Sequence, residues 1–305
     1  MTDVIVHADD FGISAGATDR IVEAHLKGCL DRTSILPNGK AFDYAVGQLK
    51  KYTDLSYAVH LNLVEGKALS SRKKIPDLVN GRGFFKHTFF SLWILYLFCK
   101  NKREKLLEQI ETEIYQQISR VRNALNCEKV ILDSHQYLHM LPFILDILNR
   151  LLKEWAIESI RIPCEPFFLA RPFHINIRNI FSLNIIKHLL LNRLSKKGLR
   201  LIDRESISYP DYSIGVLFSG KMSLGVVQEA VSRLVKRKLF SDSRIEILFH
   251  PGLADSIDAP IWEGMSKRAG FYFSNNRLKE FKVLISPEFK NYIRMIKSAQ
   301  YERGK

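Results

Sequence analysis

Cysteine is scarce in this chain of 305 residues, and its four copies lie far apart. Cys29, Cys99, Cys127 and Cys164 show none of the paired spacings that bind zinc or carry out thiol redox chemistry. We therefore expect neither a disulfide framework nor a cysteine zinc site. A reducing, cytoplasmic setting is the simplest account of this cysteine usage.

The chain also lacks a long hydrophobic run. Its most apolar stretch, residues 89–99, is about half as long as the roughly 20 residues that span a bilayer. A strand is predicted from Val4, which leaves no room before it for a signal peptide. We expect a cytoplasmic protein in which residues 89–99 form a buried helix or a helix lying on a membrane surface.

No internal repeat, low-complexity segment or break in composition divides the sequence. Hydrophobic residues make up 46% of the chain and aromatic residues 11%, which excludes a disordered protein. We expect one domain over residues 1–305, with insertions near residues 65–105 and 165–205.

Positive charge is abundant, with 46 basic against 32 acidic residues and a formal net charge of +14. Such a balance favours an anionic partner, which could be a membrane surface, a nucleic acid or a charged saccharide. The basic clusters lack the interleaved aromatic residues typical of nucleic-acid binding, so no specific nucleic acid is expected. The alternative is that the charge only keeps the protein soluble.

Short β-branched runs alternate with amphipathic helical patterns along the chain, which is typical of βα units around a parallel sheet. We predict strands over residues 4–7, 31–36, 55–59, 129–132, 159–162, 214–218 and 245–249. Helices are predicted over residues 16–27, 42–51, 104–125, 143–155 and 223–236. Seven or eight units indicate an α/β (β/α) barrel-like fold, either a distorted or an incomplete TIM barrel. Residues 65–92 are interpreted as a lid or substrate loop, and residues 167–200 have no firm boundary.

Polar residues follow several predicted strands at the point where each strand ends. Asp9 and Asp10 come after the first strand, His60 ends the third, His135 follows the fourth and His250 follows the last. Barrels of this class hold their active sites at the carboxyl ends of the strands. Two adjacent carboxylates at such a position repel each other unless a cation or a shared proton relieves them.

One carboxylate and two imidazoles, with coordination positions left open, can hold a divalent metal that activates water. The second carboxylate is then available as a general base, and a further histidine can protonate a leaving group. This combination predicts metal-assisted hydrolysis of an amide or ester. His139 lies four residues after His135, but Pro142 predicts that the helix begins later and that the two histidines lie in a loop.

Ordered motifs strengthen this interpretation. They are Ala8-Asp9-Asp10-Phe11-Gly12, Thr33-Ser34 with Asn38-Gly39, His60-Leu61-Asn62-Leu63 with Glu65-Gly66, Asp133-Ser134-His135 through His139, Arg161-Ile162-Pro163 and His250-Pro251-Gly252. Together they resemble the YdjC-like carbohydrate deacetylases, the group that contains the chitooligosaccharide deacetylases. The resemblance covers most of residues 4–252 and is weak over residues 84–103 and 167–200.

The resemblance implies a barrel-like fold and removal of N-acetyl groups from acetylated sugars with a divalent metal, usually Mg²⁺. It implies that His60, His135 and Asp10 bind the metal, and that Asp9 is the base by analogy with the double-aspartate motif of other polysaccharide deacetylases. The roles of the two aspartates could be exchanged. Zn²⁺ is the alternative metal, because two imidazoles favour a softer ion. We assign His250 as the catalytic acid.

The same motifs contribute Asn62, His139 and Arg161, which we assign to substrate binding. Three positions depart from the family pattern: His7 stands in place of a common Asn, Tyr137 in place of a common His, and Cys164 in place of a common basic residue. The last departure puts the identity of the sugar in doubt, because this part of the site would lose a charge.

Two other functions remain open. A metal-dependent phosphoesterase on the same scaffold would suit the +14 charge, although the sequence shows no second set of carboxylates for a two-metal site. A membrane-associated binding protein without turnover is the other alternative. The expected partner is an acetylated sugar, either anionic or lipid-linked, with peripheral membrane contact and a homo-oligomer as further possibilities.

Overall fold

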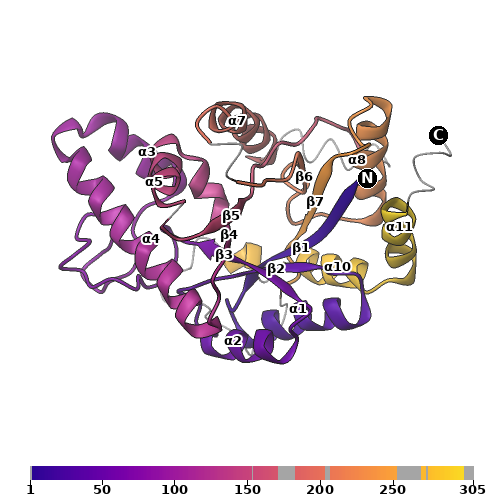
Figure 1. The fold of residues 1–305 in the computed structure, drawn as a ribbon, viewed down its shortest axis with the longest axis horizontal. Helices are drawn as coiled ribbons and strands as arrows, with labels where there is room; N and C mark the ends of the chain where they lie inside the picture. The colour runs from indigo at the N-terminus through magenta and orange to yellow at the C-terminus, as the bar shows by residue number, and fades with distance from the viewer. Residues whose placement is uncertain are drawn as a thin grey trace.

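Seven parallel strands form a single sheet in the computed structural model, which describes residues 2–152, 154–170, 183–202, 207–252, 269–272 and 274–298 (Figure 1). The strand order is β5-β4-β3-β2-β1-β7-β6. The strands are β1 (Asp3–Phe11), β2 (Arg32–Ile35), β3 (Ser56–Leu61), β4 (Val130–Ser134), β5 (Ile157–Ile160), β6 (Tyr212–Ile214) and β7 (Arg244–Phe249). The first strand of the chain thus lies inside the sheet, between β2 and β7.

The sheet curls until its two edges approach each other. A single parallel bridge joins Ser159 of β5 to Ser208, just before β6, and the Ile160 amide donates to the Ser208 carbonyl at 3.0 Å. A (β/α) barrel closes through a full ladder of strand pairs, whereas the described residues show here one bridge and, beyond it, a hydrogen bond from the Ser213 amide to the Cys164 carbonyl at 2.9 Å. The expectation of an incomplete TIM-like barrel is confirmed.

Helices surround the outside of the curled sheet (Figure 1). They are α1 (Ala15–Lys27), α2 (Phe42–Lys51), α3 (Phe89–Phe98), α4 (Arg103–Leu125), α5 (Pro142–Leu151), α7 (Leu183–Gly198), α8 (Leu224–Lys236), α9 (Ala269–Tyr272), α10 (Asn275–Leu284) and α11 (Pro287–Lys297). Short 3₁₀ turns are η1 (Lys100–Lys102) and η2 (His135–Met140). Ser14 caps α1 by accepting from the Ala17 amide, and Pro142 begins α5 where its missing N–H costs nothing.

One predicted strand is wrong over most of its length. The strand expected at residues 214–218 ends at Ile214, because Gly215 turns the backbone with φ +130°. The buried carboxylate of Glu165 then accepts the amides of Gly215 at 2.6 Å and Leu217 at 2.7 Å. Backbone groups that bond to a side chain in this way cannot extend a strand ladder.

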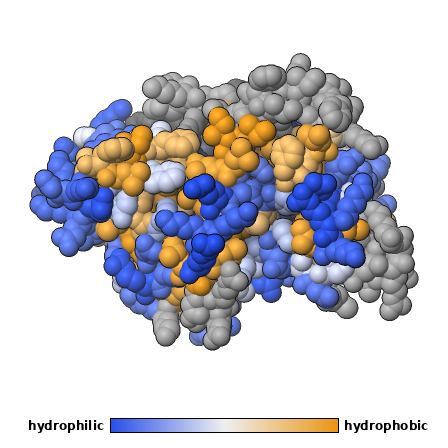
Figure 2. Space-filling view, turned by 90° about the horizontal axis from the view of Figure 1, so that it is seen from above, coloured by the Kyte–Doolittle hydropathy of each residue, from blue (hydrophilic) through white to orange (hydrophobic). Residues whose placement is uncertain are grey.

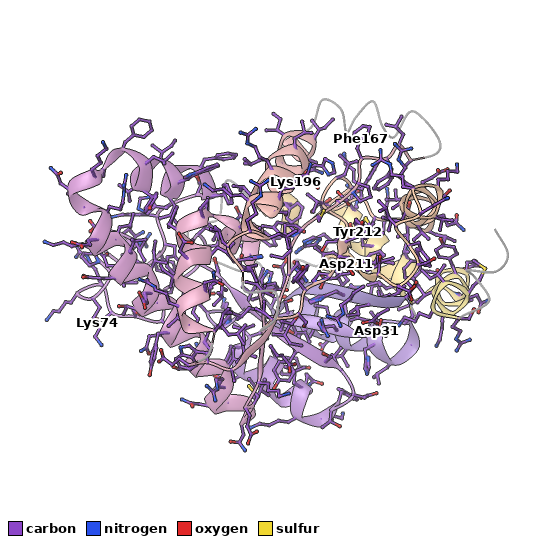
Figure 3. All side chains as sticks on the ribbon, turned by 45° about the horizontal axis from the view of Figure 1, so that its top comes forward. Asp31, Lys74, Phe167, Lys196, Asp211 and Tyr212 are labelled. Atoms are coloured by element: carbon purple, nitrogen blue, oxygen red, sulfur yellow. The ribbon has the colours of Figure 1, made fainter. Side chains whose placement is uncertain are left out.

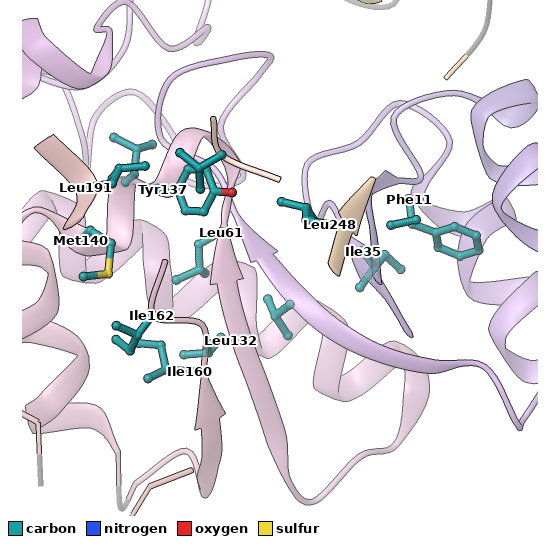
Figure 4. Packing of buried hydrophobic residues seen from close by; sticks show 14 of the residues in the cluster. Phe11, Ile35, Leu61, Leu132, Tyr137, Met140, Ile160, Ile162, Leu191 and Leu248 are labelled. Atoms are coloured by element: carbon teal, nitrogen blue, oxygen red, sulfur yellow. The ribbon is translucent and has the colours of Figure 1, made fainter. Parts of the chain in front are cut away.

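Apolar side chains fill the space between the sheet and its helices. Figure 4 shows part of this core, where Phe11, Ile35 and Leu132 come from three different strands and each is fully buried. Alternation along a strand sends the intervening residues to the interior of the barrel. On β1 those intervening residues include His7 and Asp9, so polar groups occupy the interior near the carboxyl ends of the strands.

A stripe of buried polar residues on α4 holds the long excursion that follows β3. Glu113 accepts the amides of Leu69 at 3.0 Å and Ser70 at 2.8 Å. Gln109 and Gln117 lie four residues to either side of Glu113. The side-chain oxygen of Gln109 accepts the backbone amide of Asp77, and that of Gln117 accepts the backbone amide of Asn62, both at 2.8 Å. The predicted substrate loop is therefore fastened to the helix behind it. No helix in the described part of the chain is both long and apolar enough to cross a membrane.

Candidate functional site

A β-bulge at the end of β1 places two aspartates at the centre of the molecule. The register between β1 and β2 runs from Ala8 opposite Thr33 to Phe11 opposite Ile35, so β1 contains one extra residue there. Asp10 lies in this bulge, and its backbone adopts a left-handed φ of +70°. Such bulges re-aim side chains, and strained backbone of this kind is common at functional sites. Here the bulge lets Asp9 and Asp10 both face the site.

Asp10, His60 and His135 come together as the sequence predicted. The Asp10 Oδ1 atom lies 3.2 Å from His135 Nδ1 and 3.8 Å from His60 Nε2. One ligand atom from each residue lies within 4.8 Å of the other two, and all three side chains are buried. β1, β3 and the start of η2 thus supply one carboxylate and two imidazole nitrogens at a common point.

Asp133, on β4, fixes the ring of His60. Its Oδ1 atom lies 2.6 Å from His60 Nδ1, which leaves Nε2 directed at Asp10. The other carboxylate oxygen accepts from Ser34 Oγ and lies 2.8 Å from the Arg161 guanidinium. Burial alone would raise the pKa of Asp133, but Arg161 and His60 hold the pKa well below its usual value. Asp133 therefore remains an anion that orients His60.

Tyr272 and Glu65 fix the ring of His135 from the opposite side. The Tyr272 hydroxyl lies 2.9 Å from His135 Nε2 and donates to Glu65 Oε2 at 2.6 Å. Glu65 also accepts from Gln136 Nε2 at 3.0 Å. Burial lowers the pKa of His135, but Asp10 and Glu65 outweigh that effect and raise the pKa to about 9. A cation binding at Nδ1 must therefore displace a proton.

The second oxygen of Asp10 pairs with Arg277 of α10. The guanidinium is buried and contacts the rings of both Phe271 and Tyr272, 4.8 and 4.9 Å from their centroids. Gly252 leaves the space for it, because a Cβ there would lie 2.8 Å from Arg277 Cδ. Although burial opposes it, Arg277 and His135 hold the pKa of Asp10 well below its usual value.

Asp9 has a different set of partners from its neighbour. The Nη1 atom of Arg161 donates to both oxygens of Asp9, at 3.0 and 3.1 Å. His250 Nε2 lies 3.8 Å from the Asp9 carboxylate, and the His250 amide donates to Glu280 at 2.6 Å. Burial lowers the pKa of His250 to about 4, so the ring is neutral at pH 7 in the free protein.

A second set of carboxylates lies in the interior of the barrel, and Arg161 connects its members. It binds Asp9, Asp133 and Glu246, the last at 2.7 Å. His7 adds a 2.7 Å contact between its Nδ1 atom and Glu246. The expectation that the chain has no second set of carboxylates is wrong. A cation could be placed among His7, Asp9 and Asp133, but Arg161 already supplies the positive charge there.

Asn62 and His139 are fully buried and bonded to the protein. Asn62 donates to Asn38 Oδ1 and to the Glu65 carbonyl, and accepts from the Glu65 amide. The His139 ring bonds to Ser134 Oγ at 2.5 Å and to the Arg161 carbonyl at 2.7 Å. With Arg161, these are the three residues assigned from sequence to the substrate. Their hydrogen bonds give them a role in holding η2 and the adjoining loops.

The geometry of the cluster fits a divalent metal. The Asp10 Oδ1 atom is buried and makes no hydrogen bond to any described residue. The remote nitrogens of His60 and His135 are held by Asp133 and by Tyr272, which leaves the near nitrogens facing Asp10. Metal-binding histidines are oriented by this type of outer contact. The residues present can therefore hold the metal that the sequence predicted.

Three residues of the site were not found from sequence. Glu246 had a signal, because a carboxylate in the middle of the apolar run 245–249 requires a buried partner. Tyr272 and Arg277 had none, since they follow the last recognisable motif and belong to helices that were not predicted. They reach the site only through the fold.

Fold and site together define an α/β-barrel protein with a buried histidine–carboxylate cluster at the carboxyl ends of its strands. The chain belongs to the YdjC-like family. The model of this family, described as "YdjC-like protein", matches residues 3–295.

The similarity to other proteins covers nearly the whole chain. A carbohydrate deacetylase from Danio rerio is 24% identical over 95% of this chain and 94% of its own length. One from Brevibacillus brevis is 26% identical over the same shares, 95% and 94%. A solved structure of a proposed cellobiose-phosphate cleavage protein from Enterococcus faecalis superposes with a TM-score of 0.66 at 22% identity, covering 97% of this chain and 95% of the other. That structure supports the fold.

Proposed function

We propose that the protein is a metal-dependent hydrolase that removes an N-acetyl group from an acetylated sugar. The observation that carries the proposal is the Asp10–His60–His135 cluster with the Asp9–Arg161 pair beside it. The relatives named carbohydrate deacetylase support the same class of substrate. The sugar is proposed to be anionic or lipid-linked, in keeping with the +14 net charge.

Asp10, His60 and His135 would hold the metal. Such an ion supplies Lewis acidity, which polarises the acetyl carbonyl and lowers the pKa of water. Mg²⁺ is proposed from the family resemblance, and Zn²⁺ is the alternative that the two imidazoles favour. Tyr272, with Glu65, would keep the His135 ring in position while the substrate is bound.

Asp9 would act as the general base that takes a proton from the attacking water. Arg161 holds this carboxylate by both oxygens, which fixes its direction. His250 would donate the proton that the departing amine needs. Because its ring is neutral in the free protein, it must first gain a proton, and the nearest source is Asp9, 3.8 Å away. Water and amide are then converted into acetate and a free amine.

Acetate release in the presence and absence of metal tests the proposal. The protein is stripped with a chelator, reloaded separately with Mg²⁺ and Zn²⁺, and assayed on N-acetylated oligosaccharides and on phosphorylated sugars. His60→Ala should lose bound metal and acetate release together. His25→Ala is the matched control, because the ring of that histidine contacts Asp54 and the Leu30 carbonyl, which lie outside the cluster.

The result also separates the alternatives. Phosphate release without acetate release would establish a phosphoesterase instead. Metal binding without turnover on any acetylated sugar would establish a binding protein.

A further inference from the structure

The net positive charge is concentrated in two segments. Residues 78–103 contain five basic residues and residues 166–202 contain seven, and neither segment contains an aspartate or a glutamate. Together they carry 12 of the 14 net charges, so the rest of the chain, with 34 basic and 32 acidic residues, is almost neutral. Charge that served only solubility would have no reason to gather in this way.

The same two segments expose most of the large hydrophobic side chains. Of 14 such exposed side chains in the described residues, nine belong to these segments. On α3 they are Phe90, Ile94, Leu97 and Phe98, which fall on one helical stripe, and Phe98 is 78% exposed. On α7, Ile186 and Leu189 are 56% and 63% exposed.

The two helices belong to one side of the molecule. Both pack against α5, where Tyr96 of α3 stacks on Phe143 at 4.1 Å between ring centroids. Figure 1 places α3 and α7 along the same upper edge, and Figure 2, which looks down on that edge, shows hydrophobic side chains there among hydrophilic ones. Lys196 projects from α7 on this side, with Phe167 nearby (Figure 3). We call the exposed side chains of α3 and α7 the α3–α7 face.

We propose that the α3–α7 face binds an anionic lipid bilayer peripherally. Aromatic and aliphatic side chains beside lysine and arginine are the composition of interfacial membrane anchors. Basic residues at such a surface bind acidic head groups while the apolar side chains enter the boundary of the acyl chains. A second copy of this chain fits poorly, because a symmetric contact would bring two acid-free basic surfaces together.

The face adjoins the candidate site through η2. The ammonium of Lys187 on α7 lies 4.8 Å from the centroid of the Tyr137 ring, between His135 and His139 in sequence. Resting on the proposed function, we infer that the substrate is the acetylated sugar head group of an anionic lipid. Docking the face on a bilayer would then hold that head group beside the metal ligands.

Vesicle flotation with the full-length protein tests the inference. Vesicles of phosphatidylcholine alone are compared with vesicles that also contain phosphatidylglycerol, and binding is expected only to the second. Raising the ionic strength to about 1 M, where the Debye length is ~3 Å, should remove most of it. The double variant Phe98→Ser/Leu189→Ser should weaken binding at least about tenfold. Lys196→Gln/Lys197→Gln should weaken it about fivefold for each charge removed.

Matched controls lie on α1 and α2. Leu26→Ser removes a side chain that is 54% exposed, and Lys50→Gln/Lys51→Gln removes two exposed charges, so both variants should bind vesicles normally. Equal losses in test and control variants, or no preference for anionic vesicles, would overturn the inference. So would a dimer in sedimentation velocity that Phe98→Ser abolishes.

The two proposals fail separately. Vesicle binding needs no turnover, and acetate release from a soluble acetylated sugar needs no vesicle. If flotation is negative while soluble sugars are deacetylated, the membrane inference falls and the enzyme remains. If flotation is positive while no acetylated sugar yields acetate, the membrane face stands and the proposed function falls.

Discussion

Two neighbouring carboxylates differ in this protein because their partners differ. Asp9 is held by both oxygens to Arg161, and His7 and His250 also lie beside it. Asp10 faces two imidazoles with one oxygen and meets Arg277 with the other. Asp10 is suited to bind a metal, because one of its oxygens faces the nitrogens of two histidines. Asp9 is suited to proton transfer, because Arg161 fixes its direction beside a histidine.

Replacement of Asp9 should therefore separate chemistry from metal binding. Asp9→Asn removes the proposed base, so kcat should fall by about 10²–10⁴. Bound metal, measured by elemental analysis of the dialysed protein, should stay as in the parent protein. Asp10→Asn is the comparison and should lose the metal as well as turnover. If Asp9→Asn loses the metal and Asp10→Asn keeps it, the two roles are exchanged.

Two buried tyrosines provide a second test at single residues. Tyr272→Phe removes the hydroxyl that joins His135 to Glu65, and loss of such an outer contact lowers metal affinity by about 10–100-fold. Tyr137→Phe removes a hydroxyl that is buried without a hydrogen-bond partner, so it should leave affinity unchanged and cost no stability. Calorimetric titration of the metal-free variants measures both. Equal affinities in the two variants would show that Tyr272 does not orient the ligand.

At the scale of elements, the sequence predicted those parts of the fold that depend on local pattern. Strands β1, β3 and β7 are apolar runs bounded by polar residues, and each was found within a few residues of its observed ends. The turn at η2 was also expected, because Pro142 prevents a helix from starting earlier. Since parallel strands align their carboxyl ends, the sequence alone predicts that Asp10, His60 and His135 lie close together.

Contacts between distant elements could not be predicted in this way. Arg277 reaches Asp10 across 267 positions of sequence, and Arg161 reaches Glu246 across 85. Helix α10 has a weak apolar stripe, which gives little signal of where it packs. The bulge at Asp10 was also missed, because positive φ is uncommon even for aspartate and the sequence does not show which aspartate adopts it.

The attachment of the long loop to α4 yields a prediction about stability. Glu113 is fully buried and accepts the backbone amides of Leu69 and Ser70 and the side-chain amide of Gln117. Glu113→Ala therefore removes this acceptor from three donors, two of which are buried. The free energy of unfolding should fall by about 2–4 kcal/mol. Urea denaturation measures it, with Glu108→Ala on the exposed side of the same helix as the control. If Glu108→Ala lowers the free energy of unfolding by a similar amount, the effect comes from the helix itself and not from the attachment of the loop.

At the scale of the whole molecule, the charge distribution predicts a dependence on salt. Attraction between exposed charges is screened beyond about 8 Å at physiological ionic strength. For an anionic acetylated sugar, KM should rise as salt is added while kcat stays constant, because encounter is weakened and chemistry is not. Neutral chitobiose is the comparison and should show a constant KM. If KM is independent of salt concentration for both substrates, the proposal of an anionic substrate is contradicted.

The position of β1 inside the sheet also fixes when the site can exist. The ribosome makes β1 first, yet its neighbour β7 starts at Arg244, and the register pairs Asp3 with Arg244. A nascent chain can pair β1 with β2, but the other edge of β1 stays open until residues 244–249 have emerged. Because Tyr272 and Arg277 follow β7 in the sequence, the site gains these two residues only after all seven strands have been synthesised.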